Sequence, residues 1–497
     1  MPATPRFVFE PFELDPVRRR LTSSGEPVAI SDRHLEVLLL LVARAGQIVS
    51  KDDLLTAGWK DVAVGDNSLE QAISSLRRLL GTGYIETVAR RGYRFAAAVE
   101  QKAPRESDAA LDALLAPHRA FIEGRAALET LEAGQVARAR EVFEGAVETA
   151  PEHASSHLGL ANACVMQFEM TRADLAPDTA ALVLAEQHAR EACRLDPLFA
   201  EAWATLGFVL DRSGDRRDAP AAAKRAIALE PDNWRHHFRA AFISWGEERL
   251  RAAQRTLALL PDFPLAHWMA ATVHVARQAF GEAERDLVAG LAADSGAGKA
   301  GSRFSSVALH WLLGLLYLRQ GDDSRALDEF ERELTSEHAG HLYARECAAN
   351  TWYAIGAVHL RAGRKADASA AFRRAIERVA VHSLAKVGLA AAADSGGASS
   401  APTPAAVGSA GAAVGPELAR PTDASRSSPT FDTALVRAAI LATAGADGEA
   451  ARVMDDALTA APPGNAGWLL PIEPMLNVGA HADKWAPALA RLRNRAS

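Results

Sequence analysis

The spacing of hydrophobic residues changes several times between residues 6 and 100, and the order of the changes predicts the elements of a small domain. FVFEPFELD and RRRLTSSGEPVAI are typical of short strands, the second segment turning at residues 23–27. Behind Ser31, the expected N-cap, leucines recur at helical spacing from Leu35 until Gly46 ends the run. We therefore expect short strands followed by a first helix.

Two further helices and a hairpin are expected next. Ser50 followed by Asp53 is a capping-box-like start for a second helix that runs through Trp59. A polar loop, KDVAVGDN, separates it from a third helix, SLEQAISSLRRLLG, at residues 68–81. YIETVA and GYRFAAAV then flank a basic turn at residues 89–92, and this pattern indicates a β-hairpin.

The third helix is amphipathic. Its apolar face consists of Leu69, Ile73, Leu76 and Leu80. Its polar face consists of Gln71, Ser74 and Arg78, flanked by Glu70, Ser75 and Arg77. For a single helix with two arginines, a solvated face is the simpler interpretation. Whether this face binds a partner therefore has to be judged from the neighbouring residues.

Basic residues gather around that polar face. From residue 66 to residue 94 there are five arginines, Arg77, Arg78, Arg90, Arg91 and Arg94, against Asp66, Glu70 and Glu86. A helix in the major groove of DNA, with a basic hairpin over the adjacent backbone, requires such an arrangement. The net charge of −7 excludes a generic polyanion-binding tail, so a nucleic-acid surface must be local.

A second region, about residues 110–390, is alanine-rich and repeats a helical pattern. RLDPLFAEAW and ALEPDNWRHH share a Leu–acid–Pro core, with Pro197 and Pro231 34 residues apart. Bulky and then small residues recur between them, such as Trp203 followed by Gly207. This is the tetratricopeptide spacing, in which small residues let the two helices of each hairpin pack closely. An all-α superhelix is therefore predicted.

The motifs of the first region resemble those of a known family. VSKDDLLTAGW at 49–59, DNSLEQAISSLRRLLG at 66–81 and YIETVARRGYRF at 84–95 are similar to the winged-helix effector domain of OmpR/PhoB-type response regulators. The resemblance covers residues 6–98. It implies an α+β winged helix-turn-helix domain with a four-stranded amino-terminal sheet, three helices and a carboxy-terminal wing. It also implies that the third helix enters the major groove of double-stranded promoter DNA, while the wing contacts the minor groove.

The resemblance also implies roles for individual residues. The expected DNA-binding residues are Ser68, Gln71, Ser74, Ser75, Arg77, Arg78, Thr87, Arg90, Arg91 and Arg94. The expected RNA polymerase contact is the loop before the third helix, with Trp59, Lys60, Asp61, Asp66 and Asn67. Several family members carry arginines where this chain has Ser74 and Ser75. Fewer contacts per monomer are therefore implied, with a homodimer or tandem sites on DNA.

The predicted domain order is a winged-helix domain at 1–100, a linker at 101–112 and a tetratricopeptide-repeat superhelix at 113–393. Residues 394–430 are low-complexity Ser/Ala/Gly/Pro, which predicts a disordered insertion. A final repeat and a basic capping helix are expected at 431–497. Because the chain starts directly with the effector's strands, no phospho-acceptor receiver domain is expected. A winged helix followed by such repeats resembles the one-component regulators of the CadC/HilA kind. Among these, the chain is expected to be similar to the soluble members, since no membrane span is recognisable.

The remaining signals point to a cytoplasmic bacterial protein, nucleoid-associated when bound. Three scattered cysteines fit a reducing compartment, and neither a signal peptide nor a membrane span is recognisable. SGAGKAGS departs from the phosphate-loop pattern at its first glycine and after its lysine. The histidine pairs His153/His157 and His338/His341 lack a closed ligand set. No catalytic residue, cofactor or metal is predicted.

Three function classes are compared. The first is a sequence-specific transcriptional regulator whose superhelix binds a protein, peptide or small ligand on its concave face. The second is an interaction scaffold whose winged helix docks protein instead of DNA, as the net acidity and the twin serines allow. The third is an enzyme, which lacks a recognisable catalytic constellation. The ordered motifs and the local arginines favour the regulator.

Overall fold

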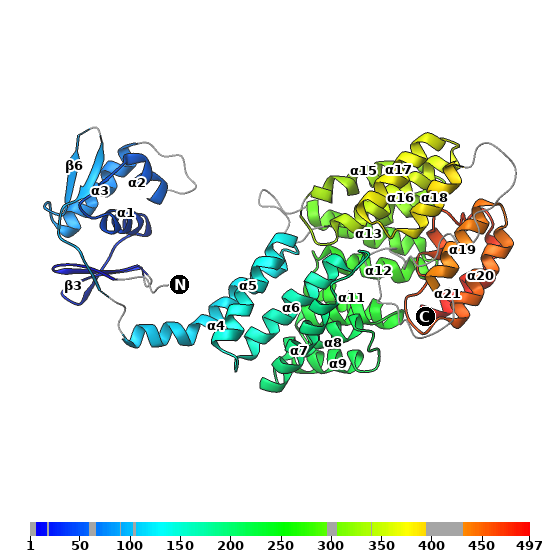
Figure 1. The fold of residues 1–497 in the computed structure, drawn as a ribbon, viewed down its shortest axis with the longest axis horizontal. Coiled ribbons are helices and arrows are strands. Elements are labelled where there is room, and N and C mark those ends of the chain that lie inside the picture. The colour runs from blue at the N-terminus through cyan, green and yellow to red at the C-terminus, as the bar shows by residue number, and fades with distance from the viewer. Residues whose placement is uncertain are drawn as a thin grey trace. The chain divides into compact units, whose positions relative to one another are not determined.

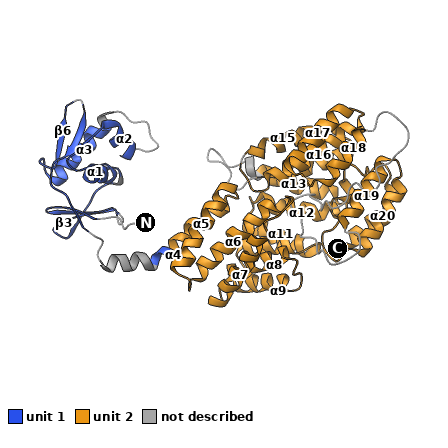
Figure 2. Ribbon diagram, viewed as in Figure 1, with its two compact units in different colours: residues 1–116 blue, residues 117–497 orange. Residues whose placement is uncertain are grey.

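The computed structural model describes residues 6–16, 19–58, 66–89, 91–102, 106–295, 306–338, 340–393 and 431–497. The chain divides into two compact units, residues 1–116 and 117–497 (Figure 2). Each unit has hydrophobic core residues of its own. The low-complexity segment 394–430, predicted to be disordered, lies outside the described residues.

The first unit is built from two antiparallel sheets and three helices (Figure 1). The strands are β1 Arg6–Phe9, β2 Phe12–Asp15, β3 Arg20–Ser23, β4 Glu26–Val28, β5 Ile48–Val49, β6 Ile85–Val88, β7 Gly92–Phe95 and β8 Glu100–Lys102. The helices are α1 Asp32–Ala43, α2 Lys51–Gly58 and α3 Asp66–Leu80. The sheets have the strand orders β4-β3-β2-β1-β8 and β5-β7-β6.

This arrangement confirms the predicted winged helix-turn-helix fold, with one correction. The amino-terminal sheet has five strands instead of four, because β8 returns after the wing and pairs with β1. β8 also occupies the first residues of the predicted linker, 101–112, and helix α4 starts at residue 106 within it. Hydrophobic spacing carries little sign of β8, since EQK is a short polar segment at a sheet edge.

Local chemistry explains where these elements begin and turn. The Ser31 hydroxyl accepts from the His34 N–H, and the Ser50 hydroxyl accepts from the Asp53 N–H, so both predicted caps are formed. Gly81 ends α3 at a φ of +110°. In the wing, a Cβ on Gly92 would lie 2.1 Å from the Val49 carbonyl oxygen. Only glycine therefore allows β7 to approach β5 at this point.

The second unit consists of helices. They are α4 Glu106–Glu129, which begins before the unit boundary, α5 Ala133–Thr149, α6 Ala154–Thr171, α7 Thr179–Leu195, α8 Ala200–Arg212, α9 Ala219–Leu229, α10 Trp234–Ile243, α11 Glu247–Leu259, α12 Pro264–Ala276, α13 Phe280–Ser295, α14 Leu309–Gln320, α15 Asp323–Thr335, η1 Ser336–His338, α16 Ala344–Arg361, α17 Lys365–Arg378, α18 Ser383–Ala393, α19 Phe431–Thr443, α20 Asp447–Ala460, η3 Leu470–Ile472 and α21 Ala482–Arg495. Within the described ranges, none of these helices has the length and apolar character needed to cross a membrane.

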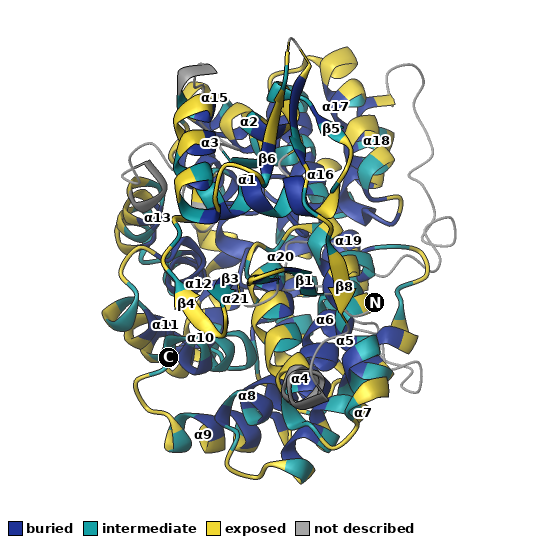
Figure 3. Ribbon diagram, turned by 90° about the vertical axis from the view of Figure 1, so that its left-hand side faces the viewer, coloured by how far each residue is buried: buried dark blue, intermediate teal, exposed yellow. Residues whose placement is uncertain are grey.

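Consecutive helices pack closely because a glycine of one helix faces an aromatic ring of a neighbouring helix. A Cβ on Gly356 of α16 would lie 2.6 Å from the ring of Phe372 on α17. Gly159 of α6 faces Phe143 of α5 in the same way, at 2.0 Å. The outward sides of helices such as α9 and α18 stay exposed (Figure 3). The predicted tetratricopeptide superhelix is thereby confirmed.

The superhelix closes on itself, which periodicity did not predict. The turn between α4 and α5 bonds to the segment before α16, where the Leu342 N–H donates to the Leu131 carbonyl at 2.7 Å. The Ala133 N–H donates to the Gly340 carbonyl at 3.0 Å. Two short backbone bonds thus join segments that are far apart in the chain.

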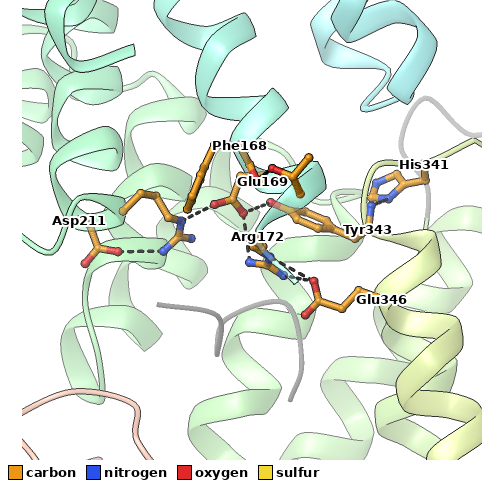
Figure 4. A network of polar contacts seen from close by, with 9 residues as sticks. Phe168, Glu169, Arg172, Asp211, His341, Tyr343 and Glu346 are labelled. Carbon is orange, nitrogen blue, oxygen red and sulfur yellow. Dashed lines mark hydrogen bonds and ion pairs between the residues drawn. The ribbon is translucent and has the colours of Figure 1, made fainter. Parts of the chain in front are cut away.

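A buried ion network reinforces this closure (Figure 4). Arg172 at the end of α6 pairs with Glu169 at 3.1 Å and with Glu346 of α16 at 2.8 Å. Arg212 of α8 lies 2.7 Å from Glu169, and the Tyr343 hydroxyl donates to Glu169 at 2.9 Å. Burial raises the pKa of Glu169, but Arg212 and Arg172 oppose this and leave it below the ordinary value. Glu169 is therefore ionised and fully engaged.

The C-terminal segment does more than cover the last helix pair. Trp468 and Trp485 are fully buried, and Trp468 packs edge-on against Trp268 of α12 with ring centroids 5.8 Å apart. η3 contacts α12 and α14, and α21 contacts α12 and α20. Glu473, just after η3, accepts a hydrogen bond from the Tyr353 hydroxyl of α16. The predicted basic capping helix is thus part of the core, because Trp485 of α21 is fully buried in it.

Replacing Arg172 with Met should destabilise the second unit. The substitution leaves the buried carboxylate of Glu346 without its cation, which costs about 3–5 kcal/mol. Arg194→Met is the control, because Arg194 forms an exposed pair with Glu191 and its loss should leave the stability almost unchanged. Urea unfolding followed by tryptophan fluorescence measures both. Equal effects of the two substitutions would contradict a role for the network in closure.

The stability should also depend on pH through Glu473. Burial raises the pKa of its carboxyl from the ordinary 4.5 to about 7. Because the folded value exceeds the unfolded one, the stabilisation is complete below pH 4.5 and is lost as the pH rises through 7. The free energy of unfolding of the wild type should fall by about 2–3 kcal/mol over this window, and the Glu473→Gln variant should not show this fall. Urea unfolding at several pH values measures both. Parallel curves for wild type and variant would exclude this assignment.

Candidate nucleic-acid interface

Helix α3 presents the predicted polar face to solvent. Gln71, Ser74 and Arg78 are exposed, whereas Ser68 and Ser75 are half-buried. On the opposite face, Leu69, Ile73, Leu76 and Leu80 are all buried in the core of the first unit. The core therefore fixes the rotation of α3, and the short polar side chains point outward.

Arg77 joins this helix to the hairpin. Its Nε donates to the Ile85 carbonyl at 3.0 Å, and its Nη2 donates to the Thr87 hydroxyl at 2.7 Å. Both acceptors lie on β6, so the guanidinium bridges the helix and the wing. Arg77 and Thr87 were predicted to contact DNA, but here their side chains bond to each other. The structure gives them a positioning role that sequence spacing did not indicate.

Carboxylates reduce the free positive charge on this surface. Arg94 of β7 pairs with Glu86 of the adjacent strand at 2.5 Å. The Arg78 guanidinium donates to the Ser75 hydroxyl only at 3.4 Å, and Arg91 at the hairpin turn is exposed. Arg90 lies outside the described residues. Of the predicted arginines that the structure describes, Arg78 and Arg91 are therefore the most available to a phosphate.

Sequence reasoning missed Lys51. This residue starts α2, and its Nζ lies 3.3 Å from the Glu70 carboxylate of α3. A lysine in the first turn opposes the helix dipole, and that conflict is the signal that could have identified it. The pair places a cation of α2 beside α3. It also offsets the one acidic side chain that flanks the polar face.

The predicted polymerase-contact loop is only partly described. Trp59, Lys60 and Asp61 lie outside the described residues. Asp66 and Asn67 belong to the first turn of α3, so the helix starts two residues earlier than predicted. Asp is common in the first turn of a helix, and nothing in this pair prevents helical backbone there.

Several histidine and cysteine side chains of the second unit are occupied or held protonated. His157 Nδ1 lies 2.8 Å from His188 Nδ1, and its Nε2 contacts the Pro151 carbonyl. Burial raises the pKa of the Cys164 thiol to about 11 and that of Cys193 to about 12. Among the residues with described positions, no group of three His, Cys, Asp or Glu side chains is placed to hold a metal ion.

Comparison with family models identifies the two kinds of domain. Residues 25–95 match the model described as "Transcriptional regulatory protein, C terminal". Residues 125–198 and 349–378 match tetratricopeptide-repeat models. The resemblance to an OmpR/PhoB-type domain followed by tetratricopeptide repeats is therefore confirmed.

Curated relatives match through the first unit. The chain is 40% identical over 94 residues to the transcriptional regulator HilA of Salmonella typhimurium, covering 18% of this chain and 17% of HilA. It is 35% identical over 116 residues to the cholera toxin transcriptional activator of Vibrio cholerae, covering 21% and 40% of the two chains. The chain thus spans less than half the length of either relative.

A solved structure covers the same region. The DNA-binding domain of Klebsiella pneumoniae RstA, solved in complex with the RstA box, is 36% identical and has a TM-score of 0.17. The match covers 18% of this chain and 96% of the RstA domain.

Arg77→Ala should loosen the wing, whereas Arg78→Ala should not. Loss of the bonds to Ile85 and Thr87 should lower the opening free energy of the hairpin by about 1–2 kcal/mol. Arg78 makes one long contact within its own helix, so its removal should cost less than about 0.5 kcal/mol. Amide hydrogen exchange of residues 85–95 measures both. Equal protection in the two variants would contradict the bridging role of Arg77.

Proposed function

We propose that the protein is a sequence-specific DNA-binding transcriptional regulator, with α3 in the major groove and the β6–β7 hairpin on the adjacent backbone or minor groove. The observation that carries the proposal is the exposed polar face of α3, fixed to a basic hairpin by Arg77. The family match over residues 25–95 supports it. HilA and the cholera toxin activator are named as transcriptional regulators, and both match this domain.

The contacts suggest a division of labour on DNA. Gln71 and Ser74 are short, exposed and uncharged, which suits hydrogen bonding to base edges. Arg78 and Arg91 are exposed cations on the helix and the hairpin, which suits phosphate contacts. Arg77 holds the two elements at a fixed separation. In this proposal the neutral side chains recognise the DNA sequence, and a few arginines supply most of the affinity.

Affinity per monomer should be modest. Arg94 is paired with Glu86, and the twin serines carry no charge, so few cations are available to displace counterions from DNA. Binding of two copies to adjacent half-sites would multiply the contacts. We therefore propose a homodimer or tandem sites on promoter DNA, with RNA polymerase as a further partner of the segment before α3. Such a protein acts in the bacterial cytoplasm, at the nucleoid.

Control is assigned to the second unit. Tetratricopeptide repeats provide a concave helical surface that suits a protein, peptide or small ligand. In this proposal the superhelix takes the place that a receiver domain holds in response regulators. A scaffold whose winged helix docks protein is the alternative. It would show pull-down partners of the first unit without chromosomal occupancy.

The electrostatic prediction can be tested on DNA chosen by in vitro selection with the full chain. Arg78→Ala and Arg91→Ala should each weaken binding and reduce the slope of log K against log salt by about 0.9 per lost phosphate contact. Glu86→Gln should do the opposite, because it frees Arg94. Glu26→Gln, on exposed β4, is the matched control for removal of one negative charge. Fluorescence anisotropy over a salt series measures all four.

Two results would overturn the proposal. The first is the absence of any enriched sequence after selection at moderate salt. The second is an unchanged salt slope in both arginine variants, since a DNA interface of this kind requires phosphate contacts.

A further inference from the structure

The second unit contains an open-sided cavity of about 150 Å³, lined by its first helix pairs and the segment before α16. Aromatic side chains form much of its wall. Phe238 contacts Phe242 and Phe263, with ring centroids 4.9 and 4.6 Å apart, and Phe208 contacts Phe242 at 5.5 Å. Tyr343 closes the cavity from the late repeats. The closure of the superhelix thereby completes one side of the wall.

Among the described residues of this apolar wall, one cation lacks a counter-ion. Arg239 of α10 lines the cavity, and its Nη2 donates to the Asn162 amide oxygen at 2.7 Å. Its guanidinium carbon lies 5.2 Å from the ring centre of Phe208. The residue as a whole is half-buried, but its Nη1 atom is buried, and no acceptor from the described part of the chain bonds to it. A buried donor of this kind is costly unless a ligand satisfies it.

The guanidinium is held in place from two sides. The Asn162 oxygen that accepts from Arg239 also accepts from the Thr205 hydroxyl of α8 at 3.1 Å, which fixes the orientation of the amide. On the other side, the Phe208 ring lies next to the guanidinium group of Arg239 and restricts its orientation. An ordered cation beside an apolar wall is pre-organised for an anion, because little side-chain entropy remains to be lost.

The other charges of this part of the cavity are matched. Arg125 lies 3.1 Å from Glu201 and 3.5 Å from Glu129, and Arg235 also pairs with Glu129. The third lining carboxylate, Glu169, pairs with Arg172 and Arg212. Arg239 is therefore the arginine of the described lining for which no carboxylate lies within ion-pair distance. Burial lowers the pKa of Arg239 to about 10, and the charge of the Glu201 carboxylate only partly opposes this. Arg239 therefore remains a cation at neutral pH.

We propose that this cavity binds a small organic acid, with one carboxylate on Arg239 and an apolar body of about one ring among the phenylalanines. A monoanion matches the one lining arginine without a carboxylate partner among the described residues, whereas a dianion would also meet the carboxylates of Glu129, Glu169 and Glu201. An apolar cavity of about 150 Å³ accommodates a benzene ring, so a phenylalkanoate has a suitable size. Resting on the regulatory function proposed above, the acid is the effector that the superhelix senses.

The route from ligand to structure follows from the wall of the cavity. Tyr343 and Glu169 line it, and both belong to the ion network that joins α6 to α16. A ligand that packs against Tyr343 therefore binds best when the superhelix is closed. Occupancy shifts the chain toward the closed form by the difference in affinity between the two states.

The test uses the full chain, with 3-phenylpropanoate as the probe in isothermal titration calorimetry. The acid should bind with a Kd below about 1 mM, and the neutral 3-phenylpropanamide at least about tenfold more weakly. Arg239→Met should lose the acid's advantage over the amide and should raise the melting temperature, because an unmatched buried cation has been removed. Arg251→Met, on the exposed face of α11, is the control and should bind like wild type.

A second variant guards against a trivial loss of structure. Asn162→Asp keeps an acceptor for Arg239 and Thr205 but supplies a carboxylate from the chain itself, so the acid should no longer bind. Equal affinity for acid and amide, or unchanged binding in Arg239→Met, would overturn the site. Acid that binds without altering affinity for the selected DNA would overturn the effector role. Calorimetry contains no DNA, so failure of the ligand site is distinguishable from failure of the DNA-binding proposal.

Discussion

The closure of the superhelix depends on one buried carboxylate. Glu169, near the end of α6, forms ion pairs with Arg172 and Arg212 and accepts a hydrogen bond from the Tyr343 hydroxyl. Arg172 also forms an ion pair with Glu346 on α16. These contacts exclude water, so each charge is stable only while its partners remain in place. An open superhelix would separate Glu346 from Arg172 and Tyr343 from Glu169, while Arg172 would keep its pair with Glu169 in the same segment. Closure is thus favoured by electrostatics at a few residues, in addition to the hydrophobic stacking of neighbouring helices.

This closure turns a repeat array into a receptor-like domain. In an open solenoid each repeat contacts only its neighbours, and the concave face is a groove. Here the segment before α16 meets the turn between α4 and α5, and Tyr343 completes the wall of an aromatic cavity. Within the described part of the chain, the cavity retains Arg239 as a cation without a carboxylate. A fold usually associated with peptide binding is therefore shaped for a small anion.

The first unit uses its arginines in a different way. Arg77 is engaged in the contact between α3 and β6, and Arg94 is paired with Glu86, so only part of the basic cluster faces outward. The local charge that made the sequence resemble a DNA-binding domain thus has two roles. Some arginines build the geometry of helix and wing, and others remain available to a phosphate. The positions of basic residues in a sequence do not separate these roles, because the separation depends on which acceptors lie within reach.

The sequence by itself determined the features that depend on local spacing. The apolar period of α3, the serine caps and the glycine-limited turns predicted the helices and the hairpin of the first unit, since these signals act over a few residues. The resemblance of its motifs implied the winged-helix fold, and the 34-residue spacing predicted the helix hairpins. Only the tertiary structure decided the pairing of β8 with β1, the bond between Arg77 and Thr87, and the closure through Glu169. It also decided that Arg239 has no counter-ion among the described residues. Each of these depends on residues far apart in the chain, or on the direction of one long side chain, and no periodicity encodes either.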